Sequence, residues 1–467
     1  MKLWGGRFRQ PLDPDFQRWQ SSFAFDRRLL SYELAASAAH ARALKNAAVL
    51  SSDELIAILQ GLEQIAAQAA SSSTFLHDEE AEDVHHFVHK QLASLIGDVA
   101  YKLHSGRSRN EQIAVDLRLY IRASIDQLEN DLATWLEALL QCAEHAHDAV
   151  MPAYTHLQPA EPVLVAHYLL AYVEMLLRDA GRLTDCRKRL NLCPLGSGAV
   201  AGATLALDRR AMAADLAFSG PTANSLDSTS DRDFVLEFVC ALSLLGLHLS
   251  RWAEEMILFS SEQYGFVQLP EAYSTGSSAM PQKKNPDLLE LTRAKAARLI
   301  GAAHTLMILT KGLPLAYNKD LQETQEALFD AVSTISSLLP LVTAWTKAAE
   351  FDYGRMREAA EAGFMNAWAA ATYLVRRGVP SSTAHEQIGK AVQLCLEKGC
   401  RLQELSLQEL HSLNPAFDTD FYACLTLESV LAIHDVVGGT APGRVRQAIV
   451  DAKQRVEAIR EGSHAHA

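Results

Sequence analysis

A segment of small, hydroxyl-bearing residues at 274–290 combines residue types suited to acid–base chemistry on an anion. Its first half, STGSSAMPQ, offers hydroxyl groups and many backbone N–H groups, and Lys283 and Lys284 follow with two positive charges. Asn285 and Pro286 match the N-cap and the first residue of a helix, and a helix N-terminus favours anions. The residues alone predict either a mobile lid over an anion or a flexible linker with solvated lysines.

A proline-rich elbow at residues 151–162 carries a second candidate. Three prolines hold Thr155 and His156 in a non-helical conformation between two long predicted helices. A histidine titrates near neutral pH and therefore suits general acid–base catalysis. The residues alone leave two interpretations open, a catalytic histidine and a hydrogen-bonded packing residue, of which the second is the commoner case.

A dense basic turn at residues 101–112 precedes a long predicted helix. Its donors, grouped around Ser105, Gly106 and Ser108, are Lys102, His104, Arg107, Arg109 and Asn110. Guanidinium groups bind carboxylate or phosphate in a bidentate manner. We therefore expect an anion clamp in this turn, with a solvated basic turn as the alternative.

Two shorter polar segments join these candidates. Residues 224–233 place Arg232 in front of an apolar helix, among several polar capping residues. Residues 317–322 end an apolar Gly/Pro break and could present Lys319 and Gln322. Both segments resemble the preceding ones in placing charge at a chain break rather than on a helix face.

The histidines and cysteines predict no metal site. His85 and His89 share one face of a predicted helix, but no third ligand is evident, so zinc is not expected. Seven cysteines occur without a C-x-x-C pair and match small core residues. We therefore expect a reducing cytoplasmic location, no metal and no cofactor.

The net charge and the hydropathy of the chain argue against several classes of binding partner. The net charge is −13, from 43 Lys and Arg against 56 Asp and Glu, which repels nucleic acid and anionic membranes. The N-terminus lacks the apolar region of a secretion signal. The most apolar run, residues 234–250, contains Glu237 and His248 and predicts a buried helix rather than a membrane span. A small anionic substrate would need a local basic cluster.

Long helices must position these residues. From 113 to 142, and again from 234 to 259, apolar residues recur at steps of four and three, the spacing of bundle helices. The second stretch is apolar on its other faces too, which favours self-association. No convincing alternation typical of strands appears. We predict an all-α protein with an N-terminal helical domain (1–107), a central long-helix bundle (108–360) and a C-terminal helical domain (361–467).

The segment GSSAMPQKKNP resembles the pattern GSSxMPxKxNP of the fumarate-releasing lyases, which include fumarase, aspartase, adenylosuccinate lyase and argininosuccinate lyase. The segments LWGGRF (residues 3–8), AEDVH, KLHSGRSRN, YTHLQ, NSLDSTSDRD and LPLAYNKDLQE are similar in order and spacing to the argininosuccinate lyase family. This resemblance runs from Leu3 to about Gly439. It implies reversible β-elimination of argininosuccinate to L-arginine and fumarate through an aci-carboxylate carbanion, as in arginine biosynthesis.

The resemblance also implies a homotetramer whose long helices form a shared bundle and whose active sites each combine three chains. It implies that Ser277 is the base, assisted by Lys283, and that His156, paired with Glu290, protonates the leaving group. The sequence leaves open which of Ser277 and His156 is acid and which is base. The implied substrate-binding residues are Ser22, His85, Ser108, Arg109, Asn110, Thr155, Arg232, Asn285, Tyr317, Lys319, Gln322 and Gln325.

The chain departs from the family pattern at the end that binds arginine. Thr324 and Gln325 stand where the family commonly has Asp and Lys, and Glu161 replaces a frequent Gln. Loss of a charged hydrogen bond weakens binding by about 1.5–3 kcal/mol. Two alternatives therefore remain: a related lyase that acts on another N-substituted aspartate, and a non-catalytic structural protein like the lens crystallins.

Overall fold

The computed structural model describes residues 10–72 and 74–464, so the predicted motif at residues 3–8 lies outside the described part. The chain forms two compact units. Unit 1 comprises Met1–Leu128, Gly181–Gly246 and Ala297–Ile335, and unit 2 comprises Glu129–Ala180, Leu247–Ala296 and Ser336–Ala467. The predicted division into three contiguous domains is a different partition and stays a prediction.

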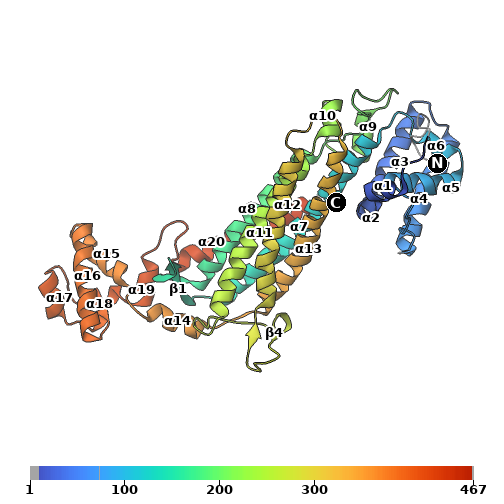
Figure 1. Ribbon diagram of the computed structural model, residues 1–467. Helices are drawn as coiled ribbons and strands as arrows, with labels where there is room; N and C mark the ends of the chain where they lie inside the picture. Colours follow the sequence, from blue (N-terminus) through green and yellow to red (C-terminus); the bar gives the residue numbers. More distant parts are fainter. Residues whose placement is uncertain (1–9, 73, 465–467) are drawn as a thin grey trace. The chain divides into compact units, whose positions relative to one another are not determined.

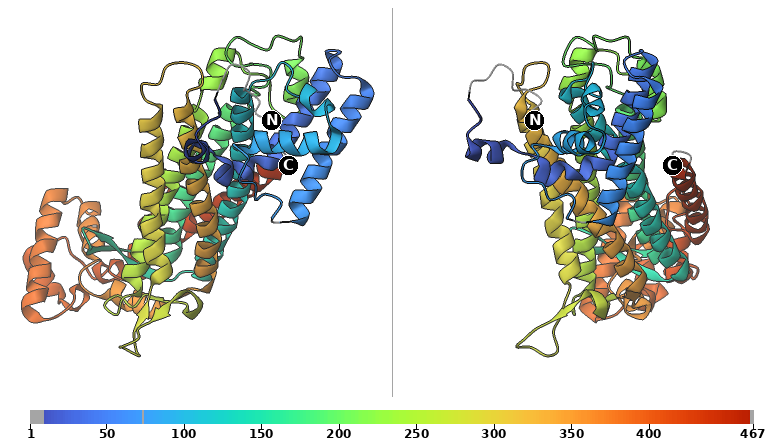
Figure 2. Two further views of the ribbon diagram at one scale, coloured as in Figure 1. Left: turned by 45° about the vertical axis from the view of Figure 1, so that its right-hand side comes forward. Right: turned by 90° about the vertical axis from the view of Figure 1, so that its right-hand side faces the viewer.

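Five long helices contribute residues to both units. They are α7 (Arg109–His145), α8 (Val165–Leu190), α11 (Asp233–Ser260), α12 (Asp287–Thr310) and α13 (Thr324–Ala348). Their segments lie side by side within each unit (Figures 1 and 2). The two predicted apolar seams fall within α7 and α11, and the all-α fold class is confirmed.

Unit 1 also contains shorter helices. They are α1 (Pro14–Gln20), α2 (Phe23–Asp26), η1 (Arg27–Leu29), α3 (Leu30–Asn46), α4 (Ser52–Ser71), α5 (Val84–Ile96), α6 (Val99–Lys102), α9 (Arg209–Asp215), α10 (Ser225–Ser230) and η3 (Lys319–Glu323). Side-chain caps fix several starts: Asp83 accepts a hydrogen bond from the His86 N–H at 2.7 Å and so begins α5.

Among its described residues, unit 2 contains three short antiparallel pairs and the C-terminal helices. The pairs are β1–β2 (Val150–Thr155, Gln158–Leu164), β3–β6 (Val267–Gln268, Glu350–Phe351) and β4–β5 (Thr275–Gly276, Lys284–Asn285). The helices are η2 (Glu271–Tyr273), α14 (Tyr353–Glu361), α15 (Ala367–Arg376), α16 (Ser381–Lys398), η4 (Leu402–Glu404), α17 (Leu407–Leu413), α18 (Phe421–Cys424), α19 (Leu427–Ala432) and α20 (Pro442–His464). Helices α15 to α18 share a core around Phe417 and Phe421 (orange in Figure 1).

The hairpin β1–β2 consists of two strands that the sequence pattern did not reveal. It occupies the proline-rich elbow, where Pro152, Pro159 and Pro162 interrupt the alternating pattern typical of a strand. Proline lacks a backbone N–H and is therefore tolerated only at sheet edges. Because a two-stranded sheet consists of edges alone, both strands can contain it.

Two helical stretches are long and apolar enough to cross a membrane, Asp233–Ser260 and Lys319–Ala348. About half of each apolar window is buried inside the chain, 50% and 56%. Within unit 2, Trp252 and Trp345 from these stretches pack edge to face with ring centroids 5.0 Å apart. Glu255 of α11 accepts hydrogen bonds from the hydroxyls of Tyr168 and Tyr172. These are the contacts of core helices.

Candidate functional site

Ser22 lies at the start of α2, where it is held by a buried carboxyl group. Its side chain is 4% exposed, and its hydroxyl donates to Asp26 Oδ2 at 2.6 Å. The other oxygen of Asp26 accepts the backbone N–H of Val84 at 3.0 Å. Burial, together with the charge of Asp83, raises the pKa of Asp26 to about 7. Asp26 thus connects Ser22 to the start of the helix that carries His85.

The raised pKa of Asp26 makes a pH-dependent contribution to stability. The native state holds a proton that the unfolded chain releases above about pH 4, so this contribution is present below about pH 4 and is lost as the pH rises to about 7. Replacing Asp26 by Asn should remove this decline, which urea unfolding of both proteins at several pH values between about 4 and 8 would measure. Parallel pH dependences in the two proteins would contradict the assignment.

Arg109 opens α7 beside two carboxylates. Its Nη1 lies 3.2 Å from Glu82 Oε2 and 3.0 Å from Asp83 Oδ2. Burial opposes the charged form, but these two carboxylates outweigh it and raise the pKa of Arg109. The N–H of Asn110 donates to Ser108 Oγ at 3.3 Å. The predicted residues of this turn therefore adopt a fixed arrangement at the N-terminus of a helix, in which Glu82 and Asp83 already pair with the charge of Arg109.

Arg232 is a buried cation with spare hydrogen-bonding capacity. Its side chain is 2% exposed, and Nη1 donates to the Asp231 carbonyl at 2.7 Å. Nε and Nη2 have no partner among the described residues. Burial lowers the pKa of Arg232 to about 10, and Tyr317, whose own pKa is raised by burial, lies close enough for their charges to interact. A buried cation with unpartnered donors is costly unless an anion binds it.

The remaining predicted residues of unit 1 lie at η3 and the start of α13. Gln322 is 9% exposed and donates to the Gln20 carbonyl at 3.2 Å, whereas Lys319 is exposed. Gln325 is 3% exposed, and its Oε1 has no partner among the described residues. The substitution at this position therefore leaves a buried acceptor where the family commonly has a cationic donor.

The basic turn corrects one sequence interpretation. Lys102 pairs with Glu54 at 2.5 Å, and the side chain of Arg107 is 1% exposed. Arg107 donates to Ser37 Oγ at 2.9 Å and lies 3.8 Å from Glu33. The expectation of an open anion clamp is therefore wrong for these two cations, because carboxylates of the same chain already neutralise them.

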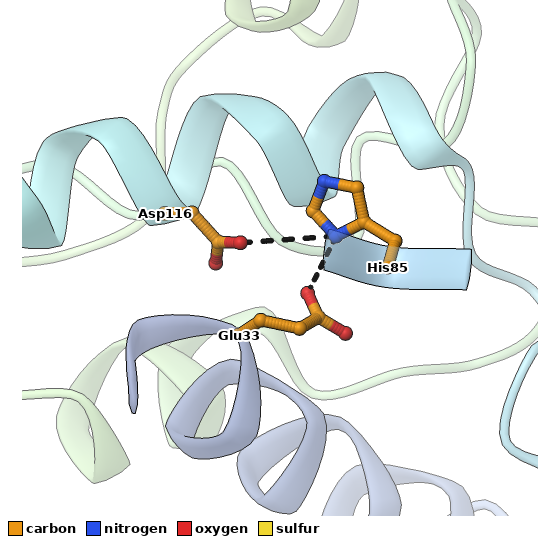
Figure 3. A group of neighbouring side chains, drawn as sticks. All are labelled: Glu33, His85 and Asp116. Atoms are coloured by element: carbon orange, nitrogen blue, oxygen red, sulfur yellow. Dashed lines mark hydrogen bonds and ion pairs between the residues drawn. The ribbon is translucent and has the colours of Figure 1, made fainter. Parts of the chain in front are cut away.

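His85 lies in the interior of unit 1, and its side chain is 2% exposed. Its Nδ1 lies 2.9 Å from Glu33 Oε2 and 3.7 Å from Asp116 Oδ2 (Figure 3). Neither Glu33 nor Asp116 is among the site residues predicted from the sequence. The available signal was an acidic residue on an otherwise apolar helix, as in YELAAS and IAVDLRL, since such residues are rarely buried without a partner.

Unit 2 presents His156 at the tip of the β1–β2 hairpin. Thr155 pairs with Gln158, so His156 and Leu157 form a two-residue turn, with φ of 55° and 57°. Thr155 and His156 are both exposed. Behind the turn, Glu161 Oε1 lies 3.4 Å from His434 Nε2, so the charge introduced at this departure from the family pattern has a local partner.

The loop around Ser277 begins and ends in the β4–β5 pair, in which Gly276 lies opposite Lys284 (Figure 1). Ser277 Oγ accepts the backbone N–H groups of Ala279 at 3.3 Å and Met280 at 3.1 Å. N–H groups aimed at an oxygen stabilise negative charge on it. These two contacts fix the position of the Ser277 hydroxyl within the loop.

The residues after Ser277 show two differences from the predictions. Helix α12 begins at Asp287, and Pro286 precedes it with its carbonyl accepting from the Glu290 N–H at 3.0 Å, so the predicted helix start is one residue early. Asn285 belongs to β5 and donates to the Gly276 carbonyl at 3.4 Å. The side chains of Lys283 and Glu290 are exposed, and no hydrogen bond joins Glu290 to His156 in the described chain.

The predicted site residues divide between the two units. Unit 1 holds Ser22, His85, Ser108, Arg109, Asn110, Arg232, Tyr317, Lys319, Gln322 and Gln325. Unit 2 holds Thr155, His156, Ser277, Lys283, Asn285 and Glu290. The acid–base candidates Ser277 and His156 thus belong to unit 2, whereas the predicted substrate-binding residues are divided between the two units.

Comparison with known proteins identifies the family. The sequence profile of the family described as Lyase matches residues 6–301, and the profile described as Argininosuccinate lyase C-terminal matches residues 364–432. The argininosuccinate lyase of Acidobacterium capsulatum is 58% identical over 97% of this chain and 94% of its own. The chain belongs to the argininosuccinate lyase family. The argininosuccinate lyase of Koribacter versatilis is 55% identical over 100% of both chains.

Solved structures agree with membership of the argininosuccinate lyase family. A variant of EDDS lyase with bound fumarate superposes with a TM-score of 0.83 at 26% identity, covering 98% of this chain and 93% of its own. A class II fumarase from Schistosoma mansoni, at 16% identity and a TM-score of 0.71, shares the fold. Members of the argininosuccinate lyase family are C–N lyases, so the chain is an enzyme rather than a purely structural protein.

Proposed function

We propose that this chain cleaves argininosuccinate to L-arginine and fumarate. The observation that carries the proposal is identity of 58% and 55%, over nearly the whole chain, to two argininosuccinate lyases. The unpartnered, buried donors of Arg232 supply a site for a carboxylate of an anionic substrate. The reaction needs no cofactor, because every step is a proton transfer or a bond cleavage that side chains can assist.

The proposed chemistry is a β-elimination. Ser277, as the alkoxide, removes a proton from the carbon beside a carboxylate, and the electron pair is held as an aci-carboxylate. The pair then forms the carbon–carbon double bond of fumarate while the bond to the guanidino nitrogen breaks. His156 donates a proton to that nitrogen, which leaves as part of arginine. A well-placed donor to the developing negative charge contributes about 3–4 kcal/mol, a role suited to Lys283 and Asn285.

The proposed assembly is a homotetramer with active sites shared between chains. Large apolar side chains of the bundle helices are exposed in the single chain, including Leu247 of α11 at 43%, Leu291 of α12 at 56% and Leu341 of α13 at 45%. Apolar side chains on long helices are typical of subunit interfaces. The predicted pairing of His156 with Glu290 stays a prediction, which a contact between chains would satisfy.

The proposed location is the cytoplasm, in soluble form and without nucleic-acid or membrane partners. Its support is the net charge of −13 and the free thiols of all seven cysteines. Free cysteines are typical of proteins in reducing compartments.

The position of Gln325 favours a second candidate, a lyase for another N-substituted aspartate. Its buried, unpartnered Oε1 would accept a hydrogen bond from a donor group of the substrate, whereas a lysine at this position would bind a carboxylate. EDDS lyase, a protein of this fold whose structure contains bound fumarate, is named for a different substrate. The two candidates share the fumarate end and differ at the leaving amine.

Fumarate release distinguishes these candidates. The purified protein would receive argininosuccinate, adenylosuccinate, aspartate or another N-substituted aspartate in separate reactions. Turnover of argininosuccinate alone supports the proposed function. A folded oligomer that releases fumarate only from another N-substituted aspartate would replace the proposed function by the second candidate.

Replacing Gln325 by Lys tests the arginine end directly. The variant is expected to lower the KM for argininosuccinate by about tenfold or more, because a charged hydrogen bond contributes about 1.5–3 kcal/mol. Steady-state kinetics of both proteins would measure this, with kcat compared to separate binding from chemistry. An unaltered or raised KM would show that Gln325 is not a weakened carboxylate site.

A further inference from the structure

Three polar side chains meet in the core of unit 1, each from a different helix. Glu33 comes from α3, His85 from α5 and Asp116 from α7 (Figure 3). Their exposed fractions are 1%, 2% and 0%. Charges this deeply buried must be compensated by neighbouring groups, because they have little contact with water.

Glu33 is the ionised member of this group. Its Oε1 accepts from Ser37 Oγ at 2.7 Å and from Gln112 Nε2 at 2.9 Å, and its Oε2 faces His85 Nδ1 at 2.9 Å. Burial alone would raise the pKa of Glu33, but the charges of His85 and Arg107 lower it to about 2. A carboxylate surrounded by three donors is the stable state, and the nitrogen facing it must carry a hydrogen.

Asp116 differs from Glu33 in having no donor. Both of its carboxyl oxygens are buried and accept no hydrogen bond from the described residues, and Oδ2 lies 3.7 Å from His85 Nδ1. A protonated Asp116 can donate a hydrogen bond to Glu33. Burial and the negative charge of Glu33 raise the pKa of Asp116 well above its usual value. A second ionised carboxylate beside Glu33, without donors, would be strongly disfavoured.

We propose that Asp116 is a neutral carboxylic acid in the native protein, and that Glu33 is a positioning residue that holds His85 as an imidazolium. The Nδ1–H of His85 donates to Glu33, which fixes the ring and leaves Nε2–H as a donor of fixed direction and positive charge. The proposed ligand of this donor is a carboxylate of the substrate, and this last step alone rests on the proposed function.

The charges around His85 agree with this state. Glu33 of α3 and Asp116 of α7 lie beside its Nδ1, and the charges of Asp26 of α2 and Asp83, the cap of α5, also raise its pKa. The guanidinium group of Arg107, a nearby cation, forms an ion pair with Glu33. Burial lowers the pKa of His85, but the charge of Glu33 outweighs it and the net shift is upward.

Spectroscopy of the intact protein tests the protonation states without any substrate. An infrared difference spectrum of the parent minus Asp116→Asn should contain the carbonyl band of one protonated carboxylic acid. Nitrogen NMR of histidine-labelled protein, with the His85 signals identified by their loss in His85→Gln, should show both ring nitrogens protonated from about pH 6 to about pH 8. Absence of the carboxylic band, a neutral His85 at about pH 7, or a stoichiometric divalent metal in the purified protein would each overturn the proposal.

Kinetics of Glu33→Gln tests the positioning role. Without the carboxylate, His85 should titrate at or below about pH 6.5, so kcat/KM for argininosuccinate should fall about tenfold or more between about pH 6 and about pH 7.5. The parent should not show this fall. Asp116→Asn, in which an amide replaces a neutral acid, should give the same pH profile as the parent. A Glu33→Gln profile that superposes on the parent's would overturn the positioning role. If the parent itself releases no fumarate from argininosuccinate, the proposed function fails, while the spectroscopic result still decides the protonation states.

Discussion

Replacing Ser277 by Ala is expected to reduce kcat for argininosuccinate by at least about 10²–10⁴-fold, with little change in the free energy of unfolding. The hydroxyl is the proposed base, and removal of a catalytic base of this kind costs about that factor. Two backbone N–H groups, from Ala279 and Met280, point at the oxygen. These N–H groups would stabilise a negative charge on the hydroxyl oxygen, but they cannot act as the base in its place. Fumarate absorbance in stopped-flow and steady-state assays would measure the loss.

The neighbouring hydroxyl supplies the control. Ser278→Ala changes the same loop by the same atom but leaves Ser277 and its two N–H donors in place. It should therefore retain most of the activity. Equal losses in the two variants would attribute the effect to loop structure, and full activity in Ser277→Ala would remove this residue from the mechanism.

Replacing His156 by Asn is expected to lower kcat by about 10²–10⁴-fold, because the guanidino group would leave without a proton donor. The loss should shrink for a substrate whose leaving amine departs readily without protonation. A proton acceptor role would not show this dependence, so the comparison also assigns acid and base between His156 and Ser277. Kinetics with two substrates of different leaving-group basicity would measure it.

Gln158→Ala is the matched control for His156→Asn, since it changes the opposite side of the same hairpin turn, next to Thr155 in register. Its activity should stay near that of the parent. Circular dichroism and the elution volume of each variant would confirm that fold and assembly are retained. If His156→Asn kept full activity with both substrates, another residue would have to protonate the leaving group.

The sequence predicted the helical fold class and two of its long helices better than the shorter elements. Helices α7 and α11 follow directly from apolar residues at steps of three and four, because that spacing places them on one helix face. The hairpin at His156 escaped prediction because its prolines hide the alternation that identifies a strand. The start of α12 was misplaced by one residue, which is within the range over which helix ends vary.

The candidate site was predicted unevenly for a physical reason. Motif residues such as Ser277 and His156 are recognisable by type and spacing, whereas the roles of Lys102 and Arg107 depend on partners distant in sequence. Lys102 meets Glu54, and Arg107 meets Ser37 and Glu33, contacts that only the folded chain establishes. Orphaned groups such as the Arg232 guanidinium are likewise visible only once burial is known.

The turn that carries His156 has a consequence for directed evolution. His156 and Leu157 both adopt positive φ, which costs about 1–2 kcal/mol for a residue with a side chain. Asn-Gly is the sequence that a two-residue hairpin turn prefers, so a selection for thermal tolerance alone should favour it at these two positions. Such a selection would yield a more heat-stable protein that lacks His156, its proposed general acid. Screens of this family for heat resistance should therefore hold this dipeptide fixed or select on turnover at the same time.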